Sequence, residues 1–321
     1  MHPILCGTDF SPQASAAMRV AAAWSARAGQ SLRLVHVWEA TIADEAMFAL
    51  QASACESLRA TLEAEADVLR AEFQIPITTS VVAGSVYEQV LREAVACDAE
   101  FIVVASVGRG MRHGWLLGSN AERIAQRATI PVLVVRDAPP LLAWMATAHE
   151  LKVSVCVDLT PASRAALRWA RGLGRMGACS LQLEYVAWPP AELRFAAYRG
   201  EIAQAGDWSE LETALAADVA LWSGAEAGHA TAHETVRAAV NWGRPDAALV
   251  ESAHASGSAL IVAGSHRRSH IARLWQGSVT RGLLHRADTN VACVPPSADE
   301  LAATNAAVDA ITGDQDARAL K

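Results

Sequence analysis

The sequence predicts an α/β protein made of two doubly wound, five-stranded parallel-sheet domains. Three observations predict this fold class. The chain has 321 residues, more than one domain usually holds, and 52% of them are apolar, which suffices for two packed cores. Short apolar runs alternate with segments of helical periodicity. Residues 4–25 are matched by residues 153–173, so the whole pattern occurs twice.

The repeat is defined by residues that recur at nearly constant separations. Asp9 corresponds to Asp158, 149 residues later, and Gly118 corresponds to Gly277, 159 residues later. The second copy is therefore longer in its middle. The prolines of segment 137–150 end the last strand of the first copy. We predict domain 1 at 1–137, a linker at 138–150, domain 2 at 151–296 and a mobile tail at 297–321.

Each element of the first copy has its own signal. Ser11 followed by Pro12 is typical of a helix start, because serine caps a helix and proline fits its first turn. Residues 44–73 carry apolar side chains at mostly helical intervals. Strands are expected at 2–8, 32–38, 77–84, 101–106 and 131–136. Two more helices are expected at capping-box patterns, Ser85 with Glu88 and Ser119 with Glu122.

The second copy follows the same plan with a longer middle region, 188–228. Ser209 and Glu212 predict a helix start within that region. Strands are expected near 152–158, 181–187, 230–236, 258–264 and 291–294. Strands that are apolar on both faces and alternate with helices indicate a parallel sheet covered on both sides. Ligands bind such sheets at the carboxyl ends of the strands, where the loops after strands one and four meet.

Composition excludes several functional classes. The net charge is −7 and no basic tract occurs, so a general nucleic-acid binder is not expected. The N-terminus lacks a secretory signal pattern, and no apolar run reaches the roughly 20 residues that cross a bilayer. The six cysteines show no paired short spacing and are expected to be reduced, mostly buried thiols. These features predict a cytoplasmic protein without a membrane span.

The loop after the fourth strand carries a related pattern in both copies. Its residues are Ala105, Gly108, Gly118 and Ser119 in the first copy, and Gly264, Arg267, Gly277 and Ser278 in the second. Together with the aspartate that ends the first strand, this pattern resembles that of the universal stress protein family, Gly-x2-Gly-x9-Gly-[Ser/Thr]. The resemblance covers about 3–136 and 152–295. It implies an adenine nucleotide alpha hydrolase-like fold with strand order 3-2-1-4-5, and an intramolecular pseudo-dimer formed through the last strands.

The resemblance also implies a nucleotide site in each crevice, for ATP with or without Mg²⁺. Asp9 is expected beside the ribose or adenine, and Val37 is expected to offer backbone groups to the adenine edge. The residues expected around the phosphates are Gly108, Arg109, Gly118, Ser119 and Asn120. Their counterparts, with those of Asp9 and Val37, are Asp158, Val186, Gly264, Arg267, Gly277, Ser278 and Val279.

The two copies depart from the family pattern to different extents. Ala105 adds one methyl group at a strand end, which is a mild change. Arg267 places a long side chain in the loop, where it either strains the backbone or offers a guanidinium to an anion. We therefore expect nucleotide binding mainly in the first copy. A purely structural interpretation stays open for each residue: Ser119 and Asp9 as helix caps, and the glycines as turn residues.

No enzyme is expected, because the sequence has neither a nucleophile–base motif nor a P-loop signature; weak ATP hydrolysis stays open. The leading hypothesis is a stress-response sensor that binds a nucleotide and acts on an unknown protein partner. The alternative is a non-nucleotide module that binds a protein or a hydrophobic ligand through domain 2. A homodimer of the tandem chain is left open.

The histidines of the second copy suggest a metal site at first sight. His229 and His233 fall in a segment with strand character, where residues four apart lie about 13 Å from each other, too far for one ion. No metal site is therefore predicted. His266 and His270, beside Arg267, form either a solvated loop or a patch for an anion, and the solvated loop is favoured.

Overall fold

The computed structural model describes residues 2–39, 45–108, 117–190, 194, 207–224, 233–265, 278–297 and 300, without the side chains of 45–52 and 278. The first half contains β1 (Ile4–Thr8), α1 (Pro12–Ala28), β2 (Leu32–Trp38), α2 (Glu45–Phe73), β3 (Ile77–Ala83), α3 (Val86–Ala96), β4 (Phe101–Ala105), α4 (Ser119–Arg127) and β5 (Val132–Val135). It is followed by α5 (Ala138–Met145). The second half contains β6 (Leu151–Val157), α6 (Pro161–Leu173), β7 (Cys179–Ala187), α8 (Ser209–Gly224), β8 (Glu234–Val240), α9 (Pro245–Ser256), β9 (Leu260–Gly264), α10 (Ser278–Arg286) and β10 (Asn290–Val294).

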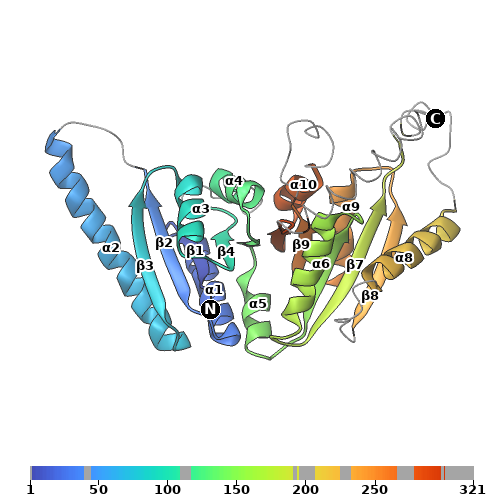
Figure 1. The fold of residues 1–321 in the computed structure, drawn as a ribbon, viewed down its shortest axis with the longest axis horizontal. Coiled ribbons are helices and arrows are strands. Elements are labelled where there is room, and N and C mark those ends of the chain that lie inside the picture. The colour runs from blue at the N-terminus through green and yellow to red at the C-terminus, as the bar shows by residue number, and fades with distance from the viewer. Residues whose placement is uncertain are drawn as a thin grey trace, which may run out of the picture.

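The strands form one ten-stranded sheet in the order β3-β2-β1-β4-β5-β10-β9-β6-β7-β8. Each half is parallel and doubly wound, and the predicted order 3-2-1-4-5 is confirmed. β5 and β10 pair antiparallel, with Leu133 opposite Ala292. These residues are 159 positions apart, the separation that relates the two copies, so each lies opposite its own counterpart. The halves thus form the predicted intramolecular pseudo-dimer (Figure 1).

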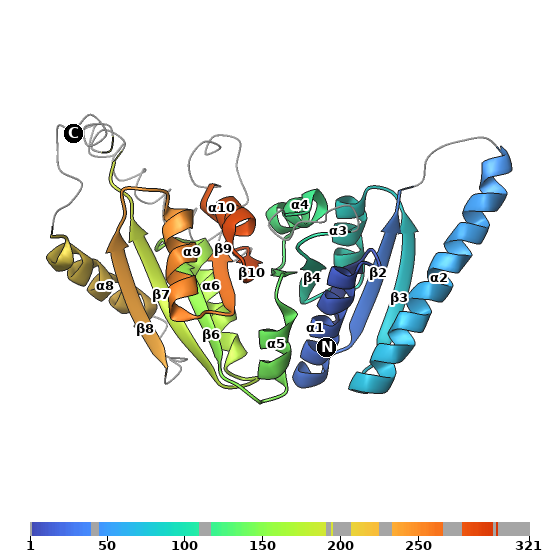
Figure 2. The same ribbon diagram turned by 180° about the vertical axis from the view of Figure 1, so that it is seen from behind.

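Helices cover both faces of the sheet and create two apolar cores (Figures 1 and 2). α1, α2, α5, α6 and α8 contribute to one core, and α3, α4, α9 and α10 contribute to the other. Successive residues of a central strand enter opposite cores: Ile102 and Val103 on β4 are both fully buried, one on each side. This explains why the strands are apolar throughout rather than alternating.

α1 begins as predicted from Ser11 and Pro12. The Ser11 hydroxyl accepts a hydrogen bond of 3.1 Å from the amide of Ala14, and Pro12 occupies the first turn. α8 also begins at the predicted Ser209. Its amide is satisfied by the Asp207 carboxylate at 3.0 Å, so the predicted capping box with Glu212 is not what starts this helix.

The capping boxes predicted for α3 and α4 do not form. Ser85 is the N-cap of α3, but its side chain makes no capping hydrogen bond. The N-cap of α4 is Gly118, so Ser119 already lies inside the helix and caps nothing. Glu122 does not reach back to the helix start, because it contacts the second half of the chain.

The segment predicted as a linker, 138–150, folds as α5 over its first eight residues. Its prolines do not prevent this, because proline is compatible with the first turn of a helix. Leu141 and Trp144 are buried between the two halves. Most of 297–321, predicted as a mobile tail, lies outside the described residues. β8 covers Glu234–Val240 rather than the predicted 230–236.

All six cysteines are free thiols, as predicted, and Cys6, Cys156, Cys179 and Cys293 are buried. Among the described helices, none is both long enough and apolar enough to cross a membrane.

Aromatic rings and polar contacts join the two halves. Trp24 of α1 stacks on Trp169 of α6 at 5.8 Å between ring centroids, and Trp144 of α5 meets Trp24 edge-on at 5.8 Å. The buried Asn290 side chain accepts hydrogen bonds from the amides of Arg136 and Asp137, at 3.0 and 3.1 Å. The halves therefore share a core and a buried polar anchor in addition to the β5–β10 pairing.

A charged contact crosses the pseudo-twofold axis between α4 and α10. Glu122 accepts a 2.7 Å hydrogen bond from the Arg281 guanidinium and lies 3.3 Å from Nε2 of His285. Glu122 and Arg281 are also 159 positions apart, so opposite charges occupy equivalent positions in the two halves. Burial acts to raise the pKa of Glu122, but the hydrogen bond from His285 and the charge of Arg281 outweigh it and lower that pKa.

We expect Glu122→Gln to lower the free energy of unfolding by about 1 kcal/mol at neutral pH. The pKa of Glu122 is lower in the folded state than in the unfolded state. Its carboxylate therefore stabilises the fold fully above the unfolded-state pKa, near about 4.3, and this stabilisation is lost as the pH falls through the folded-state pKa. Urea unfolding at pH 7 and at about pH 3.5 measures the difference. In an Arg281→Gln background, Glu122→Gln should lower the free energy of unfolding by less. An equal loss at both pH values would contradict a stabilising role for the charged Glu122 carboxylate.

Candidate functional site

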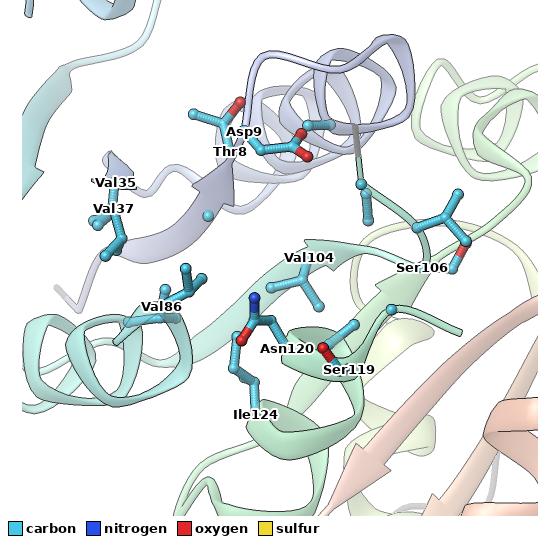
Figure 3. Close-up of a pocket in the computed structure, with 18 residues that line it drawn as sticks. Thr8, Asp9, Val35, Val37, Val86, Val104, Ser106, Ser119, Asn120 and Ile124 are labelled. Atoms are coloured by element: carbon cyan, nitrogen blue, oxygen red, sulfur yellow. The ribbon is translucent and has the colours of Figure 1, made fainter. Parts of the chain in front are cut away.

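A cavity of about 320 Å³ opens at the carboxyl ends of β1 and β4, where the sequence places the crevice of the first half. It lies between the end of β1, the loop after β4 and the start of α4 (Figure 3). Six of the predicted site residues of the first half line it together: Asp9, Val37, Gly108, Gly118, Ser119 and Asn120. The remaining one, Arg109, lies outside the described residues.

Asp9 and Gly108 meet at one corner of this cavity. A Cβ on Gly108 would lie 2.5 Å from Oδ2 of Asp9, so only glycine allows the loop to approach the carboxylate this closely. Oδ1 of Asp9 accepts a 3.0 Å hydrogen bond from the amide of Ser11. Phe10, between Asp9 and Ser11, has a φ of 60°, and its ring packs against the His36 ring in a tilted arrangement with 4.4 Å between centroids. The carboxylate thus both shapes the turn into α1 and faces the loop after β4.

The start of α4 faces Asp9 across the cavity. Figure 3 shows Ser119 and Asn120 on the α4 side, with Thr8 and Asp9 opposite. The amide of Gly118 is already used, since it donates to the carbonyl of Ser106 at 2.7 Å. Within the described residues no side chain caps α4, so the amides of its first turn, together with the helix dipole, favour an anion.

Gly118 has an ordinary extended φ of −65°, so its role is close packing rather than a special backbone conformation. A Cβ there would lie 3.3 Å from the carbonyl oxygen of Ser106.

The floor of the cavity is apolar, and most of its residues were not predicted as site residues. Val37 lies one position beyond His36, which pairs with the last residue of β1, so its backbone extends past the end of that strand. Val35, Val86 and Val104 surround it (Figure 3). Such a surface suits the flat face of a base. The sequence signal was present for Val35 and Val104, since strand residues next to a crevice must have one side in it, but apart from Val37 the residues of these strands were predicted only as strand residues.

The second half has a cavity of about 530 Å³ at the equivalent place. Four predicted residues line it: Asp158, Val186, Gly264, Val279. Ser278 begins α10, but its side chain is not described, and Arg267 and Gly277 fall outside the described residues. Asp158 repeats the turn of Asp9: its Oδ1 accepts from the amide and the hydroxyl of Thr160, at 3.1 and 2.5 Å.

Gly264 has a packing role that the motif alone did not indicate. A Cβ on Gly264 would lie 2.5 Å from the carbonyl carbon of Ala162 and 2.7 Å from the amide nitrogen of Ser163. The first turn of α6 therefore lies directly against the end of β9. In the first half the same position is Ala105, so the equivalent contact there leaves room for a methyl group.

A wall on one side of the second cavity was not predicted. It consists of Trp188, Pro189, Pro190 and Arg194, and the Arg194 guanidinium lies 3.7 Å over the Trp188 ring. Thr280 of α10 also lines the cavity and donates to the carbonyl of Gly264 at 2.9 Å. A Trp-Pro-Pro sequence directly after a strand could have indicated this wall, because its counterpart after β2 starts with Glu39.

The described linings carry few groups that could do chemistry. Asp9 is the one ionisable side chain among the described lining residues of the first cavity. In the second cavity burial, followed by the charge of Glu184, raises the pKa of the Cys156 thiol far above its usual value, so that thiol stays protonated. Within the described part of the chain no group of three or more histidine, cysteine or acidic side chains is placed to hold a metal ion.

Comparison with known proteins agrees with this architecture. The model of the Universal stress protein family matches residues 1–136 and 151–295. A universal stress protein of Mycolicibacterium smegmatis is 33% identical over 135 residues, which is 42% of this chain and 45% of that protein. The match thus spans less than half the length of this relative.

One solved structure extends the likeness to the whole fold. A universal stress protein from Archaeoglobus fulgidus aligns over 93% of this chain and 97% of its own, with 16% identity and a TM-score of 0.64. A universal stress protein in complex with cAMP aligns over 42% of this chain and 96% of its own, with 23% identity and a TM-score of 0.34. Since the family model matches both halves, the chain belongs to the universal stress protein family and carries two of its domains in tandem.

Proposed function

We propose that the first half binds ATP or a related nucleotide and that the protein acts as a nucleotide sensor in a stress response. The observation that carries this proposal is the uncapped start of α4 facing Asp9 across a cavity of about 320 Å³. Helix starts of this kind bind phosphate through amides and dipole together. The apolar floor around Val37 would take the base, and Asp9 would accept hydrogen bonds from the ribose.

We further propose that binding, rather than turnover, is the function of this cavity. Hydrolysis needs a group that activates water, and the ionisable group described in the lining, Asp9, already accepts a hydrogen bond from Ser11. A nucleotide bound there would contact α1, the loop after β4 and α4 at once. Because Glu122 of α4 contacts α10, a shift of α4 on nucleotide binding would also affect the second half.

Ser119 offers a sharp test of phosphate binding. Ser119→Glu places a negative charge at the start of α4, which favours the helix but repels a phosphate. Ser119→Gln is the matched neutral control. We expect the glutamate variant to bind ATP–Mg²⁺ on the order of a hundredfold more weakly than the glutamine variant in isothermal titration calorimetry.

Two further observations frame this experiment. Val95→Trp, on the exposed face of α3 away from the cavity, should bind ATP as the unaltered protein does. Mass spectrometry of ligand released from freshly purified, denatured protein should detect a nucleotide. The proposal fails if the unaltered protein gives no heat with millimolar ATP, or if the glutamate and glutamine variants bind equally.

A second candidate function is favoured by one observation. The second cavity is larger than the first, and its wall of Trp188, Pro189, Pro190 and Arg194 makes it chemically different. This favours a ligand other than a nucleotide in the second half.

A further inference from the structure

The cavity of the second half is bounded by residues that have no equivalent in the first half. Trp188, Pro189 and Pro190 follow β7 directly, where the first half has the exposed Glu39 after β2. Arg194 lies one turn further along, with its amide donating to the carbonyl of Pro190 at 3.1 Å. The volume is about 530 Å³, within the range of roughly 300–1,000 Å³ that is typical of sites for small organic ligands.

The polar groups at the start of α6 are satisfied by one another. Thr160 and Ser163 form a reciprocal capping box, and Asp158 accepts from both the amide and the hydroxyl of Thr160. These groups therefore do not need a ligand. The equivalent helix of the first half, α1, is likewise capped by a side chain, that of Ser11.

The remaining described interior of the second cavity is apolar apart from Thr280, whose hydroxyl donates to the carbonyl of Gly264. Val186 of β7, Leu249 of α9 and Val279 of α10 face it from three different elements, and Pro245 adds to them. Burying an apolar body among these side chains is favourable because it removes apolar surface from water.

Two hydrogen-bond donors of the wall have no acceptor within the described residues. They are the indole Nε1 of Trp188 and Nε of Arg194, and both atoms are buried. No described carboxylate lies within ion-pair distance of the Arg194 guanidinium, which instead lies over the Trp188 ring. Buried donors without acceptors are costly, so they commonly indicate a missing partner. Here two such donors, one of them cationic, lie side by side at the edge of an apolar cavity.

We propose that the second half binds a small organic acid with an apolar body. The carboxylate accepts hydrogen bonds from Arg194 and from Nε1 of Trp188, and the body lies among Val186, Leu249 and Val279. A carboxylate fits because its bonds to a guanidinium are charge-assisted and therefore stronger than neutral ones. This proposal concerns a different cavity from the nucleotide site and does not depend on it.

Calorimetric titration of the full-length protein with 2-naphthoate and with octanoate tests the proposal. At least one of the two acids should bind saturably with one site per chain. The alcohol with the same body, 2-naphthalenemethanol or octanol, should bind at least roughly tenfold more weakly than the acid, because it lacks the charge. Arg194→Gln should weaken acid binding by at least about tenfold. Trp188→Phe keeps an aromatic ring but removes the indole Nε1, and it should weaken acid binding several-fold.

Matched controls separate this site from the nucleotide site. Arg92→Gln changes an exposed arginine of α3 in the same way and should leave acid binding unchanged. Ser119→Glu should weaken ATP binding yet leave acid binding intact, whereas Arg194→Gln should weaken acid binding and leave ATP binding intact. Circular dichroism verifies that each variant is folded. The proposal is overturned if neither acid binds, if the alcohols bind as well as the acids, or if folded Arg194→Gln binds with unchanged affinity.

Discussion

Trp144→Ala is expected to lower the free energy of unfolding by about 3–5 kcal/mol, the range for removing a fully buried tryptophan. The side chain is 1% exposed and packs edge-on against Trp24 in the core between the halves. Its substitution would leave a cavity where α5 joins both domains. Guanidinium unfolding followed by far-ultraviolet circular dichroism measures the effect.

Trp144→Phe is the matched control for this prediction. Nε1 of Trp144 has no hydrogen-bond partner within the described residues, so substitution by phenylalanine removes ring volume but no hydrogen bond. It should cost clearly less than alanine. A cost below about 1 kcal/mol for Trp144→Ala would mean that α5 is only a connection and not part of the shared core.

Gly264→Ala should destabilise the protein by about 1–3 kcal/mol or more, although it adds a single methyl group. The new Cβ would lie 2.5 Å from backbone atoms of Ala162 and 2.7 Å from the amide of Ser163. Backbone cannot rotate away as a side chain does, so α6 has to move away from β9. Thermal unfolding detects the loss, and the change should also alter the second cavity, which Gly264 lines.

The equivalent position of the first half provides the opposite substitution. Ala105→Gly removes a methyl group that the first half accommodates, and it should cost no more than about 1 kcal/mol. If Gly264→Ala were tolerated as easily as Ala105→Gly, the close packing of α6 on β9 would not be the reason for glycine there.

The sequence predicts the strands well because they depend on local apolar runs and on the repeat, and the resemblance to the family supplied their order. Helix starts are less predictable, since they depend on contacts from elsewhere in the chain. Ser119 and Glu122 fit a capping box locally, yet Glu122 contacts Arg281 of the other half and Gly118 becomes the N-cap. The prolines of 138–150 were interpreted as the end of a strand followed by a linker, although at the first turn of α5 they are compatible with a helix.

The candidate site is predictable to the extent that it follows the family pattern. Asp9 and Gly108 are brought together as expected, because the ends of neighbouring parallel strands meet at one edge of the sheet. The wall of Trp188 and Arg194 was missed because it belongs to no repeat and to no motif. Gly264 was assigned to the ligand site by its motif, whereas its contact with α6 depends on three-dimensional packing.

The opposite charges of Glu122 and Arg281 bear on how chains sort during assembly. If two chains exchanged partners so that like halves associated, one junction would bring two carboxylates together and the other two guanidinium groups. Repulsion at both junctions disfavours such mispaired species, while the correct fold gains an attraction. At high protein concentration the tandem chain is therefore less prone to associate incorrectly with its own copies.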